Sequence, residues 1–375
     1  MNPTRIRDFG ITVGTLPTGA LNKITDVPGV RVGHATIDTD RQKTGVTVIL
    51  PAEGNLFTQP LTAACHVING FGKSAGLMQV QELGTLETPI ALTGTLNVGK
   101  IHDALVSYTI EQCEAEGKTC RSVNPVVGET NDGTLCANND RPADKTHLDA
   151  AVASACADFA EGDVGAGKGT VCMGLKGGIG SASRVLEMGD RTFTLGVLVQ
   201  TNFGCVENLR LDGLPVGRAV VDLIHEEDAR RAEAITGQDD IGSIMIIVGT
   251  DLPVSELQLG RILRRATVGL ARTGSYVGHG SGDVVIGFTT ANRRGNGRRC
   301  AGDDGVTRTV EILNNGKLEK AFTAVADCVE EAIYNSMIAA DTVTGFNGKD
   351  SVTVRALNEF LPEALTRARA YAGGR

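Results

Sequence analysis

The chain has 375 residues, 41% of them hydrophobic and 21% charged, which is typical of a globular protein with a full hydrophobic core. Its net charge of −8 argues against a general nucleic-acid binder, which needs a basic face to neutralise phosphates. No apolar run is long enough to span a bilayer, and the N-terminus lacks the apolar stretch of a secretory signal, so we expect no membrane partner. The nine cysteines stand singly, without a C-x-x-C pair. Free thiols of this kind are typical of a reducing cytoplasm, so we expect a cytoplasmic protein without a metal site.

Short apolar runs alternate with helical patterns along the chain. β-Branched runs closed by turn residues predict strands at 45–51, 192–201, 283–292 and 307–313. Helical periodicity predicts helices at 73–83, 101–117, 145–161, 254–272, 324–340 and 355–372. Thr146 followed by Asp149 predicts a capping box for the third of these helices. Because no linker, repeat or charge block interrupts the pattern, we expect one α/β domain with sheets covered by helices.

A glycine-rich segment at 162–170, GDVGAGKGT, nearly matches a phosphate-binding loop. Gly162, Gly167 and Lys168 have the required spacing, but position 169 is Gly where the motif needs Ser or Thr for magnesium. The segment also follows a predicted helix, whereas such a loop follows a strand. A glycine-rich turn is the favoured interpretation, and a nucleotide-binding protein is kept as an alternative.

Three polar clusters follow or precede predicted strands. Residues 124–135 contain Glu129, Asn131 and Asp132, residues 198–204 end in Asn202, and residues 278–283 contain Ser281 and Asp283. Each cluster taken alone is explained as a turn, because Asn, Asp, Ser and Gly form turns through local hydrogen bonds. Taken together they are polar groups at strand ends, where layered α/β folds gather their active-site residues.

The Gly242–Ser243 dipeptide stands just before the apolar run 244–248. A serine needs a base to become a nucleophile, and no histidine is near. If the chain is cut before Ser243, this residue gains an α-amine, whose reference pKa near 8 suits a base at neutral pH. Asp239 and Asp240 would then belong to a flexible tail of the upstream chain. A plain turn before a strand explains the same dipeptide from the residues alone.

The stretch GSIMIIVGTDLP, with the Arg- and Leu-rich LGRILRRATVGLAR after it, resembles the self-cleavage site of the DmpA/BapA family of self-processing serine aminopeptidases. These are L-aminopeptidase/D-esterases or β-peptidyl aminopeptidases, peptidase family S58. The resemblance runs through most of the chain, in the order ITDVPGVRVGHATI, GVTVILP, NGFGKSAGL, NPVVGETNDG, LVQTNFG and GSGD. Several blocks in one order are more specific than any single block.

The resemblance implies an αββα four-layer sandwich, Ntn-hydrolase-like and of the DmpA/ArgJ-like type. It implies one catalytic domain over 1–375, cut into an α-chain 1–242 and a β-chain 243–375 that stay associated and assemble into a larger homo-oligomer, with a tetramer favoured. The implied activity is removal of N-terminal residues from short peptides, amides or esters, D- or β-amino acids among them, with no cofactor.

The resemblance also implies roles for individual residues. Ser243 matches the nucleophile and Gly242 the other side of the cut bond, while Ser281 and Asp283 match a Ser/acid pair that moves protons. Asn202 matches the oxyanion donor, and Glu129 the acid that receives the free amine of the substrate. Asn131 and Thr134 in the same loop are expected to contact substrate, although some relatives carry Tyr in place of Thr134. A related oligoamide hydrolase or an acyltransferase is the alternative within this fold.

Overall fold

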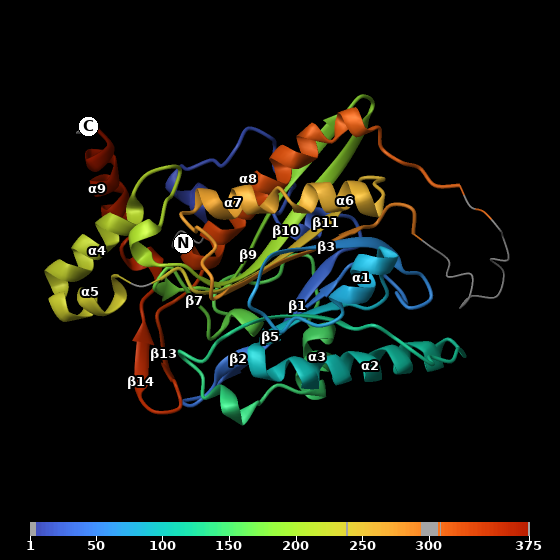
Figure 1. Ribbon diagram of the computed structural model, residues 1–375, viewed down its shortest axis with the longest axis horizontal. Coiled ribbons are helices and arrows are strands. Elements are labelled where there is room, and N and C mark those ends of the chain that lie inside the picture. The colour runs from blue at the N-terminus through green and yellow to red at the C-terminus, as the bar shows by residue number, and fades with distance from the viewer. Residues whose placement is uncertain (1–4, 238, 294–306, 308, 374–375) are drawn as a thin grey trace.

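Two β-sheets stacked face to face form the centre of the computed structural model (Figure 1). The structure describes residues 5–237, 239–293, 307 and 309–373. The smaller sheet has the order β1-β2-β5-β6, with β1 Arg31–Asp38, β2 Lys43–Leu50, β5 Ile90–Gly94 and β6 Val126–Thr130. The larger sheet has the order β4-β3-β12-β11-β10-β9, with β3 Leu61–Gly70, β4 Thr85–Leu86, β9 Ile179–Met188, β10 Arg191–Phe203, β11 Gly242–Thr250 and β12 Ser281–Thr289.

Helices cover the outer face of each sheet. α2 (Val98–Ala115) and α3 (Lys145–Ala153) pack on the smaller sheet, and α6 (Glu256–Leu263), α7 (Ala266–Arg272) and α8 (Glu319–Ile338) pack with the larger one (Figure 1). The layers are therefore helix, sheet, sheet, helix, which confirms the αββα sandwich. The remaining helices are α1 (Leu77–Leu83), α4 (Val216–Glu227), α5 (Ala229–Ile235) and α9 (Leu361–Gly373). Two short hairpins complete the fold, β7 (Val171–Cys172) with β8 (Leu175–Lys176) and β13 (Val343–Phe346) with β14 (Ser351–Val354).

The central strand β11 is buried on both faces. Ile244, Ile246 and Val248 join the hydrophobic cluster on the helical side, whereas Met245 and Ile247 join the cluster between the sheets. Because side chains alternate along a strand, Ser243 shares the face of Met245 and points into the layer between the sheets. The apolar run thus anchors a serine at the end of a rigid, central strand.

Most predicted elements are confirmed, with differences at their ends. The helix predicted for 145–161 ends at Ala153, because the chain then turns and Cys156 exchanges two backbone hydrogen bonds with Val32. Its cap is Asp144, whose carboxylate accepts the Thr146 N–H at 3.0 Å, so the capping box predicted at Thr146 lies two residues too late. The helix predicted for 254–272 is divided into α6 and α7.

The strand predicted for 307–313 is wrong within its described part. Residues 309–313 have no sheet partner there, and Val310 and Ile312 are exposed. A β-branched run forms a strand only where a sheet edge is available to pair with it. None of the helices in the described ranges has the length and apolar character needed to cross a membrane.

Candidate functional site

A cavity of about 760 Å³ opens where β10 ends and β11 begins. This volume lies within the range of small-molecule sites. Five of the residues expected at the site line it: Ser243, Gly242, Asn202, Asn131 and Thr134. The others, Glu129, Ser281 and Asp283, are not among the lining residues and are almost fully buried.

The backbone at Gly242 admits only glycine. Its φ is +124°, and a Cβ added there would lie 2.0 Å from the Asn202 carbonyl oxygen on β10. The next residue, Ser243, is 5% exposed, and its Oγ donates to the Gly242 carbonyl oxygen at 2.6 Å. The hydroxyl is thus held against the carbonyl group of the peptide bond that precedes it.

Asn202 is fixed in one orientation beside Ser243. The two residues are direct partners in the antiparallel pairing of β10 with β11. Asn202 Oδ1 accepts the Val171 N–H at 2.9 Å, which leaves Nδ2 as the free donor of the amide. No described residue hydrogen-bonds to Nδ2, and the side chain lines the cavity beside Ser243.

Ser281 and Asp283 form a buried pair on β12, where Ser281 Oγ donates to Asp283 Oδ1 at 2.6 Å. Burial raises the pKa of Asp283 to about 6; the Ser281 hydrogen bond opposes this rise and the Asp240 carboxylate adds to it. The parallel register sets Ser281 opposite Gly242 and Asp283 opposite Ile244. The pair therefore lies beside the backbone at residues 242–244, and no hydrogen bond among the described residues joins it to Ser243 Oγ.

Glu129 is the last but one residue of β6 and is 1% exposed. Its Oε1 accepts the Lys73 N–H at 2.8 Å, while its Oε2 has no described partner. Gly72 stands between this carboxylate and β12, since a Cβ at Gly72 would lie 3.3 Å from Glu129 Oε1 and 3.7 Å from Gly282 Cα. In the same way a Cβ at Gly282 would lie 3.0 Å from Ser243 Oγ. The two sheets thus bring an acid and a nucleophile to one end of the sandwich.

The flexible tail expected for Asp239 and Asp240 concerns the cut chain, and in the intact chain Asp240 is held in place. Asp240 is 1% exposed, and its Oδ2 accepts the Ser275 hydroxyl at 2.7 Å and the Tyr276 N–H at 2.8 Å. The Asp240 N–H in turn donates to the Tyr276 hydroxyl at 2.8 Å. In the intact chain, Asp240 therefore anchors the backbone two residues before Gly242.

Several residues that line the cavity were not expected from the sequence. Phe71 and Lys73 belong to the NGFGKSAGL block, whose resemblance to the family is the signal that points to them. Asn347 and Lys349 lie in the turn between β13 and β14, where no pattern in the sequence pointed to the site.

The glycine-rich segment 162–170 does not form a phosphate cradle. Lys168 Nζ lies 2.8 Å from Asp38 Oδ2 and 2.9 Å from Asp163 Oδ2. The ammonium group is therefore already paired with two carboxylates and does not offer its charge to a phosphate. Gly165–Gly167 form a buried 3₁₀ turn, and no α-helix follows it directly. Within the described residues, no group of three or more His, Cys, Asp or Glu side chains is arranged to hold a metal ion.

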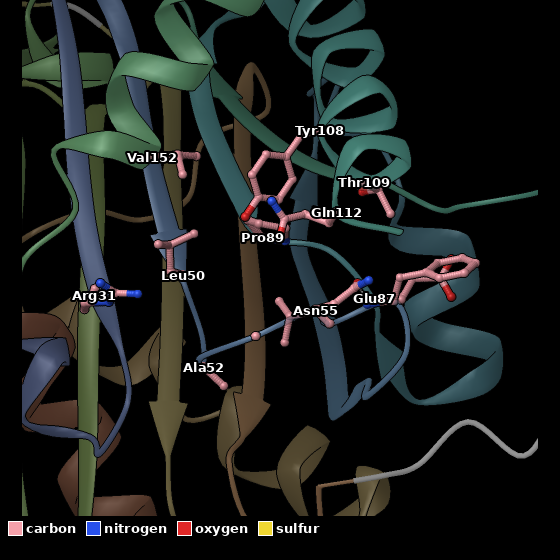
Figure 2. A pocket seen from close by; sticks show the side chains of 13 residues that line it. Arg31, Leu50, Ala52, Asn55, Glu87, Pro89, Tyr108, Thr109, Gln112 and Val152 are labelled. Carbon is pink, nitrogen blue, oxygen red and sulfur yellow. Dashed lines mark hydrogen bonds between the residues drawn. The ribbon is translucent and has the colours of Figure 1, made fainter. Parts of the chain in front are cut away.

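A second, smaller cavity of about 210 Å³ lies near β2 and α2 (Figure 2). Figure 2 shows Arg31, Glu87, Tyr108 and Gln112 among its lining side chains. None of the expected site residues is among them. The cavity where β11 begins is therefore the candidate site.

Known proteins resemble the chain over almost its whole length. The model of peptidase family S58 matches residues 22–351. β-Peptidyl aminopeptidase BapA of Sphingosinicella microcystinivorans is 37% identical over 358 residues, covering 92% of this chain and 88% of the relative.

Solved structures agree with this likeness. A β-aminopeptidase of a Burkholderia species matches with a TM-score of 0.84 and 38% identity, over 97% of this chain and 99% of that one. The L-aminopeptidase D-Ala-esterase/amidase of Ochrobactrum anthropi, a prototype of the serine aminopeptidases with a variant Ntn-hydrolase fold, matches with a TM-score of 0.86 and 34% identity, over the same shares. The Ntn-hydrolase-like fold expected from the sequence is therefore confirmed.

Proposed function

The chain belongs to peptidase family S58 and is an aminopeptidase, and from this membership we propose that it activates itself by cutting the Gly242–Ser243 bond and then uses Ser243 as an N-terminal nucleophile. The α-chain would be 1–242 and the β-chain 243–375. The observation that carries this proposal is the hydrogen bond of 2.6 Å between Ser243 Oγ and the carbonyl oxygen of the bond to be cut.

The self-cleavage step transfers an acyl group within the chain. Ser243 Oγ attacks the Gly242 carbonyl carbon, the C–N bond breaks, and Gly242 becomes an ester on Ser243 Oγ. Water then hydrolyses the ester, which gives the Gly242 carboxylate and the free α-amine of Ser243. Three features favour this step. Gly242 has a backbone conformation that only glycine adopts, it pairs with Phe203 on β10, and Asp240 fixes the backbone two residues upstream.

The peptidase step reuses the same hydroxyl. The new α-amine, with a reference pKa near 8, takes the Oγ proton as Oγ attacks the scissile carbonyl of the substrate. Asn202 Nδ2 stabilises the oxyanion, and removal of such a donor costs about 100- to 1000-fold in kcat. Ser281 and Asp283, on the strand beside the Ser243 backbone, hold and pass the proton of that amine.

Glu129 receives the free amine of the substrate in this proposal. Its buried carboxylate has one oxygen without a described partner, and charge-assisted hydrogen bonds to an ammonium group are strong. Asn131 and Thr134 line the cavity and contact the rest of the substrate. Recognition of the N-terminus by Glu129 is what makes the hydrolase an aminopeptidase.

Denaturing mass spectrometry tests the self-cleavage. The purified protein should contain two chains with a boundary between Gly242 and Ser243, and Ser243→Ala should remain one inactive chain. A single intact chain that persists on long incubation yet cleaves peptides would refute the proposal.

The preferred substrate is a short peptide, amide or ester with a free amine, with β- or D-amino acids accepted. The β-peptidyl activity named for the 37% identical relative supports this substrate class, and we propose a homo-oligomer of αβ units, with four favoured. Ala- and β-Ala-p-nitroanilide should be hydrolysed faster than 6-aminohexanoate oligomers, and N-acetylornithine should donate no acetyl group. The reverse order would favour the oligoamide hydrolase or the acyltransferase.

A further inference from the structure

Lys176 is a fully buried lysine that has no role in the reaction described above. Its side chain is 0% exposed and lies in the β7–β8 hairpin, directly opposite Val171. The ammonium donates to three backbone carbonyls: Gly167 at 2.9 Å, Thr170 at 2.9 Å and Gly177 at 2.7 Å. Three acceptors match the three N–H groups of a charged lysine. Burial nevertheless lowers the pKa of Lys176 to about 7, because removing the ammonium group from water disfavours its charged form.

One of these carbonyls leads directly to the oxyanion donor. The Thr170 carbonyl and the Val171 N–H belong to the same peptide group, and that N–H donates to Asn202 Oδ1 at 2.9 Å. The contacts therefore run from the Lys176 ammonium through one peptide group to the Asn202 amide. Asn202 Nδ2 is the free end of this chain and lines the cavity beside Ser243.

A charge at one end of such a chain strengthens the donor at the other end. A cation on a carbonyl oxygen polarises the amide group and makes its N–H a better donor, and the next amide responds in the same way. The effect is largest where water is excluded, and Lys176, Thr170 and Asn202 are all buried.

We propose that Lys176 is a positioning residue of the oxyanion hole, which acts through the Thr170–Val171 peptide group to orient and polarise the Asn202 amide. The inference rests on the proposed role of Asn202. Its expected effect is a kcat about tenfold higher than that of an enzyme with a neutral residue at 176, with KM little changed. A residue that only holds the loop would not act through Asn202.

The test is a double-mutant cycle on the processed enzyme with β-Ala-p-nitroanilide. Lys176→Met removes the charge and leaves an unbranched side chain one atom shorter. Lys176→Gln removes the charge but keeps the two N–H groups of a neutral amide for the loop carbonyls, and it serves as the test if the methionine variant does not fold. Lys168→Met is the matched control, because that lysine lies in the same glycine-rich segment but pairs with Asp38 and Asp163. Each substitution at 176 is also made in an Asn202→Ala background.

The inference predicts a drop in kcat of about tenfold for either substitution at 176, less than about twofold in the Asn202→Ala background, and no change for Lys168→Met. A drop of equal size in both backgrounds would show that Lys176 only supports the loop, and an unchanged kcat would show that its charge is not used. Either result overturns the inference. A normal kcat in Asn202→Ala alone would instead refute the proposed role of Asn202.

Discussion

Two buried carboxylates on the helix-covered side of the larger sheet, Glu331 and Asp283, have opposite surroundings. Glu331 on α8 is 0% exposed and accepts hydrogen bonds from Arg184, Arg7 and Asn22, all at 2.6 Å. Burial opposes its ionisation, but the two guanidinium groups hold its pKa below the usual value. Asp283 in the candidate site has no cation beside it among the described residues: its Oδ1 accepts the Ser281 hydroxyl, and burial raises its pKa to about 6 although hydrogen bonds from Ser281 and the Ile244 backbone oppose the rise.

The contrast separates a buried charge that stabilises the fold, at Glu331, from a buried carboxyl group that we assign to the reaction, at Asp283. A buried charge that serves the structure has its hydrogen bonds satisfied, as Glu331 does. Glu129, Asp240 and Asp283, all near the cavity, each retain a carboxylate oxygen without a described partner. The surrounding strands hold these three carboxylates in place, and those oxygens can accept a proton or a hydrogen bond from an amine.

The largest expected effect is on the structural side of this contrast. Glu331→Gln leaves Arg184 as an uncompensated buried charge and should lower the free energy of unfolding by about 3–5 kcal/mol. Urea unfolding followed by circular dichroism measures it, with the exposed Glu319→Gln on the same helix as control. A loss below about 1 kcal/mol would mean that the paired cluster is not structural.

On the functional side, Glu129→Gln should lower kcat/KM about 100-fold for substrates with a free amine, because the charge-assisted hydrogen bonds to the ammonium group are lost. The free energy of unfolding should change little, since the variant can still accept the Lys73 N–H. The same variant assayed on an N-acetylated ester is the control. Equal losses on both substrates would remove Glu129 from amine recognition.

Asp283→Asn should stabilise the protein while it lowers activity. The pKa of Asp283 is raised from 3.8 to about 6, so the folded state binds the proton more tightly than the unfolded state. Its contribution to stability is therefore fully present below pH 4 and is lost as the pH rises through 6. The neutral amide avoids that loss, and the variant should be more stable than the parent by about 2–3 kcal/mol at pH 8.

Thermal unfolding at pH 4 and pH 8 measures this difference, which should vanish at the lower pH. Asp38→Asn is the opposite control: burial raises the pKa of that carboxyl, but the hydrogen bonds and charges of Lys168 and Lys43 together hold it below its usual value. A gain at pH 8 that is as large for Asp38→Asn would contradict the assignment to Asp283.

The smallest expected effect concerns Thr134. This side chain lines the cavity, and a tyrosine there would extend a hydroxyl toward the oxyanion. Thr134→Tyr should raise kcat by about two- to fivefold, and Thr134→Phe, which has the same ring without the hydroxyl, should not. Steady-state kinetics on β-Ala-p-nitroanilide separates the two variants, and an equal rise in both would assign the effect to packing.

The sequence predicted the sheets, the helices and most of the expected residues that line the candidate cavity more fully than it predicted the contacts around them. Periodic apolar runs such as 244–248 identify a strand because burial and alternation leave a local pattern. The Asp240 anchor and the Lys176 contacts leave none, since their partners lie tens of residues away or are backbone carbonyls. The strand predicted at 307–313 fails for the same reason: pairing depends on a neighbour that the local pattern does not contain.

The most direct test of the central claim is to trap the nucleophile. The active protein is treated with a serine-reactive sulfonyl fluoride, denatured, digested and analysed by mass spectrometry. The account predicts complete inactivation with one label, carried by the hydroxyl of Ser243 on a β-chain whose first residue is Ser243. A label on any other side chain of the inactivated protein, or on Ser243 within an uncut active chain, would contradict it.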